Sequence, residues 1–176
     1  MSGEKKRRGR RAYLDDYQAL ADGRIVYTGK VYSYAGSTDW KKELLALWLR
    51  AGSAGVCVIA AGTIPASGMM NTFYVIVPWV FSFIGAGSVI WALCRMTHHG
   101  EHLEEYVLKA TVRALPVRTA FTAVCAAVAV LGQALCLILN GPGRALWADV
   151  CFFPLMALAA GLAAWLSPRS RALRFE

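Results

Sequence analysis

The sequence has no close pair of cysteines, few acidic residues and no apolar run directly behind its basic start. Its 5 cysteines form no C-x-x-C pair, which excludes the usual motif of a thiol-redox membrane enzyme. Asp and Glu number 11 against 19 Lys and Arg, so the formal net charge is +8. A long stretch separates "EKKRRGRR" from the first apolar run, whereas a secretory signal peptide places that run almost immediately after its basic residues. We therefore expect no cleaved signal peptide.

Apolar residues, by contrast, make up 57% of the chain. A soluble domain of this size has too little polar surface to cover so much apolar side chain. A helix that crosses a bilayer needs about 20 mostly apolar residues. Four such runs are present, at 44–66, 73–96, 117–139 and 145–167. The sequence therefore predicts an all-α integral membrane protein with a four-transmembrane-helix bundle over residues 41–168.

Lys and Arg are concentrated before the first run, between the second and third runs, and after the fourth. The connections "SGMMNT" and "NGPGR" contain a single basic residue, Arg144. Because short basic segments stay in the cytoplasm, we expect both termini there, in a plasma or inner membrane. The stretch "KKRRGRR" is also typical of a nucleic-acid-binding arm. Beside membrane helices we prefer attraction to anionic lipids of the cytoplasmic leaflet, and we expect no nucleic-acid partner.

Residues 1–40 are predicted to form a cytoplasmic tail in three parts. A disordered basic start precedes "AYLDDYQALADG", whose apolar residues predict a short helix over 13–21 that ends at Gly23. The stretch "RIVYTGKVYSYAG" is rich in strand formers and predicts a β-hairpin that turns at 28–30. A lone hairpin is marginal in water, so it would pair with a second copy, a partner's sheet or the helix ends; a packed connector without a binding role is the alternative. The candidate docking residues are Tyr27, Tyr32, Tyr34 and Trp40.

Residues 101–115 are predicted to form an amphipathic helix at the cytoplasmic membrane surface, and 169–176 a cytoplasmic tail. The stretch "HHGEH" precedes this helix, and in it His98, Glu101 and His102 match the spacing of inverted zinc peptidases. That motif needs a continuous helix and a distant third ligand, but Gly100 interrupts it at a predicted helix end. We therefore expect no metal and no cofactor; His98 and His102 are weak metal candidates.

Ionisable residues are scarce within the predicted spans. Arg50 lies about two turns inside the first span, from which it either reaches lipid phosphates or faces a pore or a partner. Asp149 lies one turn inside the fourth span, near its outer end. No residue resembles a proton relay, although a neutral pore between subunits is an alternative. The candidates for lipid-headgroup contact or for a pathway are Arg50, Ser82, Gln133 and Asp149.

Small residues recur in every span, as in "AGSAG", "GAGS", "AVCAAVAV" and "ALAAGLAA". Small residues allow close backbone contact, which drives helix association in lipid. They predict a tight bundle with little room for an aqueous lumen within one subunit. We therefore predict a non-catalytic subunit that packs against other membrane subunits or against itself and docks through its cytoplasmic elements. The alternatives are a small oligomeric channel or transporter and, behind it, a membrane-bound hydrolase.

Overall fold

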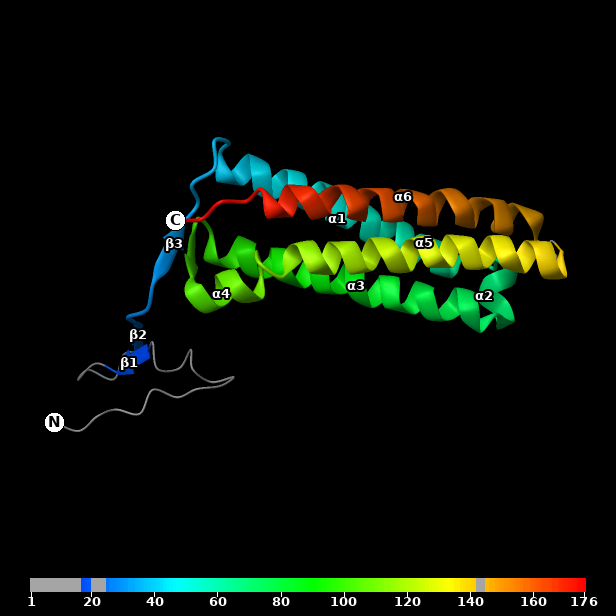
Figure 1. Ribbon diagram of the computed structural model, residues 1–176, viewed down its shortest axis with the longest axis horizontal. Helices are drawn as coiled ribbons and strands as arrows, with labels where there is room; N and C mark the ends of the chain where they lie inside the picture. Colours follow the sequence, from blue (N-terminus) through cyan, green and yellow to red (C-terminus); the bar gives the residue numbers. More distant parts are fainter. Residues whose placement is uncertain (1–16, 20–24, 142–144) are drawn as a thin grey trace.

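The structure is a computed structural model and describes residues 17–19, 25–141 and 145–176. Four long helices lie along its long axis (Figure 1). Each of the four is long and apolar enough to cross a membrane. Their ends differ from the predicted spans by a few residues, because polar residues continue the helices beyond their apolar parts. The four helices are α1 (Trp40–Thr63), α3 (Phe73–His99), α5 (Leu115–Asn140) and α6 (Leu146–Arg171).

The helix ends have local causes in the sequence. Asp39 caps α1, because its side chain accepts a hydrogen bond from the backbone N–H of Lys41 at 3.1 Å. Gly100 and Gly141 end α3 and α5 with φ values of 69° and 72°, a conformation that glycine adopts without steric cost. A short helix, α2 (Ser67–Asn71), lies between α1 and α3.

The four long helices form a closed ring in which each packs against two neighbours. The order around the ring is α1, α3, α5, α6 and back to α1. Helices joined by the two short connections are neighbours, namely α1 with α3 and α5 with α6. Helix α2, the end of α5 and the start of α6 lie at one end of the bundle, termed the far end (Figure 1).

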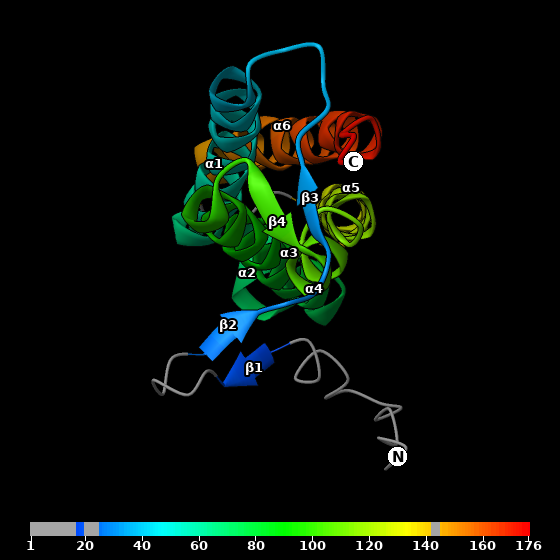
Figure 2. The same cartoon turned by 90° about the vertical axis from the view of Figure 1, so that its left-hand side faces the viewer.

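At the opposite end, three segments that are distant in sequence come together. Strand β3 (Val31–Ser33) pairs antiparallel with β4 (His102–Glu104), with Tyr32 opposite Leu103. On its other edge, β3 pairs with the end of the chain: the N–H of Ser33 donates to the carbonyl oxygen of Glu176 at 2.7 Å, and the reverse bond is 3.0 Å. The set of β3, β4 and residues 174–176 is termed the cap. Figure 2 shows β3 and β4 lying across the helix ends.

Three local predictions for this end are wrong. Strand β1 (Tyr17–Ala19) pairs with β2 (Ile25–Tyr27), so the helix predicted over 13–21 is a strand at 17–19, and its other residues lie outside the described ones. The hairpin turning at 28–30 does not form, because β3 pairs with β4 and not with β2. The helix predicted from 101 begins only with α4 (Glu105–Ala110), after β4. The second and third predictions fail because β3 and β4, distant in sequence, pair with each other, which local periodicity does not report. The first fails because β1 pairs locally with β2 although the residues of β1 have helical spacing.

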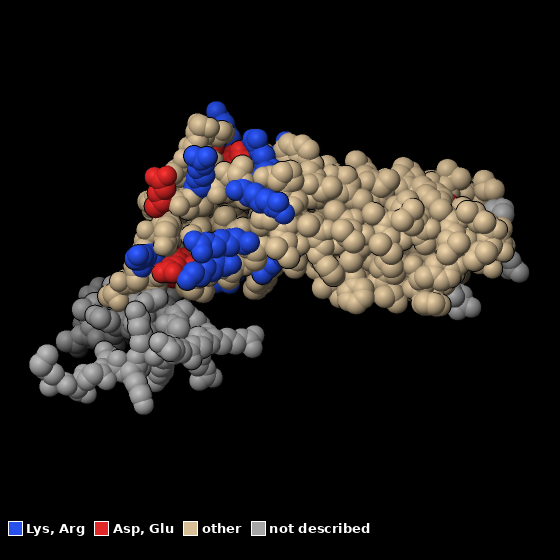
Figure 3. Space-filling view, viewed as in Figure 1, with Lys and Arg blue, Asp and Glu red and all other residues tan. Residues whose placement is uncertain are grey.

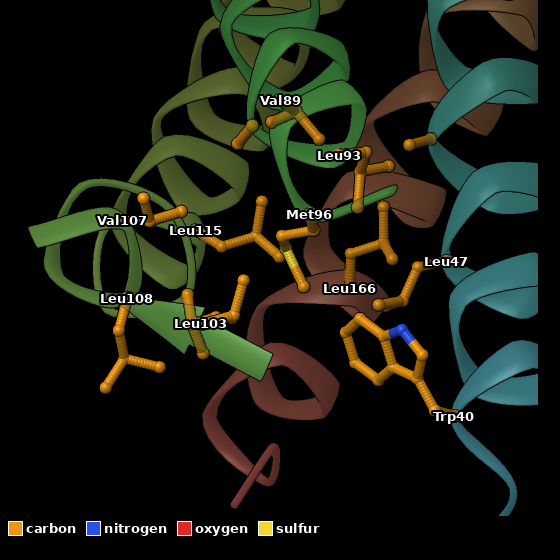
Figure 4. Close-up of a cluster of buried hydrophobic side chains, with 13 residues drawn as sticks. Trp40, Leu47, Val89, Leu93, Met96, Leu103, Val107, Leu108, Leu115 and Leu166 are labelled. Atoms are coloured by element: carbon orange, nitrogen blue, oxygen red, sulfur yellow. The ribbon is translucent and has the colours of Figure 1, made fainter. Parts of the chain in front are cut away.

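Buried apolar side chains form two cores along the bundle. One core, termed the charged-end core, lies beneath the cap and is drawn in Figure 4. Its members are Trp40, Leu47, Ala51, Val89, Ala92, Leu93, Met96, Leu103, Val107, Leu108, Val112, Leu115 and Leu166. The far-end core consists of Cys57, Val58, Ala61, Ala66, Val75, Ala126, Ala129, Cys136, Phe152, Met156 and Ala159. Leu103 and Val107 were predicted to lie on a membrane surface, and the structure buries them in protein instead.

Candidate functional site at the charged end

Charged side chains gather at the end of the bundle that carries the cap (Figure 3). This is termed the charged end, and the rest of the visible face of the helices carries neither Lys, Arg, Asp nor Glu in Figure 3. The described Lys and Arg lie in the cap, in the segments next to it and in the halves of the helices nearest to it: Lys30, Lys41, Lys42, Arg50, Arg95, Lys109, Arg113, Arg118, Arg169, Arg171 and Arg174. The distribution is the one that sequence analysis expected for the basic side of the chain.

Two arginines of this end lie around one indole ring. The guanidinium carbon of Arg50, on α1, is 3.9 Å from the ring centroid of Trp165 on α6, and that of Arg169 is 5.9 Å from it. The Nε and Nη2 atoms of Arg169 also lie 3.1 and 3.4 Å from the two carboxylate oxygens of Glu43, which is buried. Arg50, Arg169, Trp165 and Glu43 are termed the arginine cluster. The cluster contains two guanidinium groups and one carboxylate, and only Arg169 pairs with that carboxylate, so its net charge is positive.

Arg118 shows how a structural arginine is satisfied at the same end. Its Nη1 donates to the carbonyl oxygen of Ser88 at 2.9 Å, and its Nη2 donates to that of Ala110 at 3.1 Å. Ser88 lies on α3 and Ala110 is the last residue of α4, so Arg118 connects three helices. A cation at a helix C-terminus also complements the helix dipole. Arg118 therefore has a structural role.

The inner side of the cap is aromatic. The ring of Tyr34 is 5.0 Å from Trp40 and 5.6 Å from Phe175, centroid to centroid, and Trp40 and Phe175 are 5.6 Å apart. Burial raises the pKa of the Tyr34 hydroxyl above its ordinary value; the carboxylate of Glu43 raises it further, and Arg169 opposes both. The Tyr34 hydroxyl is therefore neutral at physiological pH.

The four candidate docking residues occupy different positions. Trp40 is buried, and Tyr32 and Tyr34 are half-buried against the charged-end core. The hydroxyl of Tyr27 accepts a hydrogen bond from the N–H of Glu105 at 3.3 Å, which ties β2 to α4. A docking role for these side chains stays a prediction. Strand alternation instead turns Val31, Ser33 and Ala35 outward, and Val31 is 54% exposed.

The histidines of the "HHGEH" stretch lie on two elements. His98 is in the last turn of α3 and His102 is in β4, with Gly100 ending the helix between them. The Nδ1 atom of His102 is 2.9 Å from the hydroxyl oxygen of Ser33, which joins the two paired strands. In the described ranges, no three His, Cys, Asp or Glu side chains are grouped as metal ligands. The stretch therefore contributes a strand contact to the cap.

Of the four pathway candidates, only Gln133 and Asp149 meet. Asp149 is 2% exposed at the far end, and its Oδ1 accepts hydrogen bonds from Gln133 Nε2 at 2.9 Å and from the N–H of Ser67 at 2.7 Å. These bonds connect α6 to α5 and to the start of α2. Ser82 donates to the carbonyl oxygen of Trp79 within α3, and Arg50 lies at the charged end. The four therefore do not line one path.

A small cavity separates the two cores. Its volume is about 10 Å³, which suffices for about one water molecule and is far below that of an aqueous conduit. Its lining consists of Ala51, Ala54, Ala86, Val89, Thr119, Thr122, Ala163 and Leu166. The helices otherwise approach closely: a Cβ atom on Gly85 would lie 2.4 Å from Thr122 Oγ1. This packing agrees with the tight bundle that the small residues predicted.

Sequence reasoning found Arg50 but missed the rest of the arginine cluster. A usable signal exists within each helix: Glu43 and Arg50 lie seven residues apart, and Trp165 and Arg169 lie four apart, so each pair shares a helix face. The order of the helices in the bundle, which the sequence does not report, brings these two faces together.

Compared with known protein families, with curated proteins and with solved structures, the chain matches none. What it does is therefore inferred from its own contacts.

Proposed function

We propose that this chain is a non-catalytic integral membrane protein that serves as a subunit of a membrane complex, with its charged end in the cytoplasm. Four helices of membrane-crossing length and apolar character support insertion. The gathering of the described Lys and Arg at one end supports the orientation, because short basic segments remain on the cytoplasmic side.

The cap is the observation that carries the proposal. Strand β3 is hydrogen-bonded on both edges and is backed by the aromatic rings of Tyr34, Trp40 and Phe175. A two-stranded hairpin alone would be marginal in water, but these contacts hold β3 against the bundle. The outward side chains of β3 therefore form a fixed surface beyond the apolar length of the helices. Such a surface suits contact with a second copy or with another subunit.

The interior contacts favour a subunit over a channel or transporter. Gln133 and Asp149 bond to each other and to the N-terminus of α2, so their polar atoms serve helix packing. The cavity of about 10 Å³ between the helices is too small to serve as a conduit. A pore between copies is the second candidate function, and flux through liposomes of the pure protein is the measurement that would favour it.

The docking proposal is tested on the full-length protein in mild detergent. We expect native mass spectrometry to show a complex, either with a second copy or with a stoichiometric co-purifying subunit. The substitution Val31→Glu places a charge on the outer face of β3, opposite Glu104, and is expected to dissociate that complex while lowering the melting temperature only slightly. The control Arg113→Glu changes an exposed residue at the same end, outside the cap, and is expected to leave the complex intact. A monomeric wild-type chain with no bound subunit would refute the proposal.

A further inference from the structure

Arg50 is the charged residue that lies furthest along α1 from its start. It follows Trp40 by ten residues, which corresponds to about 15 Å of helix. Side chains on a helix lean toward its N-terminus, and α1 begins at the charged end. Accordingly, Arg50 Nη1 donates to the carbonyl oxygen of Ala46, one turn back, at 3.0 Å. The guanidinium of Arg50 is thus directed toward the boundary where charged side chains begin.

The donors of the arginine cluster exceed the acceptors around them. A guanidinium has five N–H donors. Within the described part of the chain, Arg50 makes one hydrogen bond, and Arg169 uses its Nε and Nη2 atoms for Glu43. Arg118, by comparison, has a backbone acceptor for each of its two terminal nitrogens. The arginine cluster therefore needs further acceptors, and at a lipid boundary the strongest acceptors at hand are phosphate oxygens.

We infer that the arginine cluster binds the phosphate of an anionic phospholipid at the boundary between α1 and α6. A phosphate accepts paired hydrogen bonds from a guanidinium group. The guanidinium carbons of Arg50 and Arg169 lie 3.9 and 5.9 Å from the ring centroid of Trp165, which places two cationic groups beside one indole. The positive balance of the cluster favours a headgroup of net negative charge over a zwitterionic one.

The position of Trp165 supports a lipid as the source of that phosphate. Its indole is partly exposed beside both guanidinium groups, and tryptophan is enriched at the headgroup level of membranes. Large apolar side chains such as Leu49 and Leu158 are exposed on the same two helices, as acyl-chain contact requires. The inference rests on the membrane insertion in the proposed function, but it is independent of docking by the cap.

The test counts lipids retained by the full-length protein. Native mass spectrometry in mild detergent would compare phosphatidylglycerol with phosphatidylcholine at equal concentration. We expect wild type to retain one phosphatidylglycerol where phosphatidylcholine is lost. Arg50→Gln is expected to reduce that retention about tenfold, because a charged hydrogen-bond donor is lost. Arg50→Lys keeps the charge without the planar fork and should fall between the two.

The matched control is Arg171→Gln, which removes a charge from the exposed last residue of α6 and should leave retention unchanged. Equal loss in the Arg50 and Arg171 variants would overturn the inference in favour of diffuse attraction. Equal retention of phosphatidylglycerol and phosphatidylcholine by the wild type would also overturn the inference, and this comparison needs no substitution. Displacement by an equal concentration of inorganic phosphate would also overturn it. Val31→Glu separates the two proposals, because it should abolish docking and preserve lipid retention.

Discussion

The two ends of the same four helices are held together by different kinds of side chain. The charged-end core is built from large residues, including Leu93 and Met96 of α3 and Leu103 of the cap (Figure 4). The far-end core is rich in alanine, with Phe152 and Met156 as its largest members. The far end adds a buried polar network around Asp149, whereas the buried Glu43 of the charged end pairs with Arg169, whose side chain is half exposed.

The difference follows from the solvent with which each contact competes. Where the alternative is water, burial of a large apolar side chain lowers the free energy by about 1.5–3 kcal/mol. Where the alternative is lipid, burial gives no such gain, and close backbone contact and hydrogen bonds hold helices together. In the proposed orientation the cap lies in water and the far-end core lies among lipid tails. Large side chains under the cap and small ones beyond it are what this arrangement requires.

A close contact at the far end shows how small residues act. Pro78 lies within α3 and has no N–H, so the carbonyl oxygen of Tyr74, four residues earlier, lacks its usual helical donor. That oxygen faces α5 at Gly132, where an added Cβ atom would lie 2.6 Å from it. Gly132 thus lets the backbone of α3 approach α5 at the carbonyl oxygen that loses its helical donor to Pro78.

The largest effect is expected from Gly132→Val. The added side chain would clash with backbone, which cannot rotate away, so we expect a loss of at least about 3 kcal/mol in the free energy of unfolding. Gly161→Val is the matched control, because nothing lies within 4 Å of the Cβ position of Gly161 on the exposed face of α6. Reversible unfolding in mixed detergent micelles measures both variants. Equal stability of the two would show that close approach does not hold the far end together.

Leu103→Ala is expected to cost about 3 kcal/mol, since it leaves a cavity in a core that competes with water. Hydrogen exchange should accelerate in β3 and β4 while the far ends of α5 and α6 stay protected. The control is Leu131→Ala on α5, where the leucine is 68% exposed on the apolar surface and its loss should be nearly neutral. A similar cost for both leucines would contradict the contrast between a water-facing and a lipid-facing end.

A smaller cost, about 2 kcal/mol, is expected for Asp149→Ala, because the N–H of Ser67 and the amide of Gln133 lose a buried acceptor. Asp149→Asn retains one acceptor oxygen and should recover part of this loss. Thermal unfolding in detergent, followed by circular dichroism, would compare them. If Asp149→Ala were neutral while liposome flux changed, the network would serve a pathway, and the channel alternative would gain support.

Regular features of the chain were readable from local sequence. The four apolar runs and the concentration of basic residues each depend on neighbouring positions, and the structure confirms four long apolar helices. The strands were predicted poorly. Tyr17–Ala19 has helical spacing yet pairs with Ile25–Tyr27, and β3 takes its partners from residues 102–104 and 174–176.

The sequence by itself determined where apolar and charged segments alternate along the chain, because hydropathy and charge act residue by residue. Only the tertiary structure decided which helix faces meet, and so it alone placed Arg50 beside Trp165, Gly132 against Tyr74, and Asp149 within reach of Gln133. Those contacts join residues far apart in the chain. They depend on the order, rotation and depth of the helices, and one hydropathy pattern is compatible with many such arrangements.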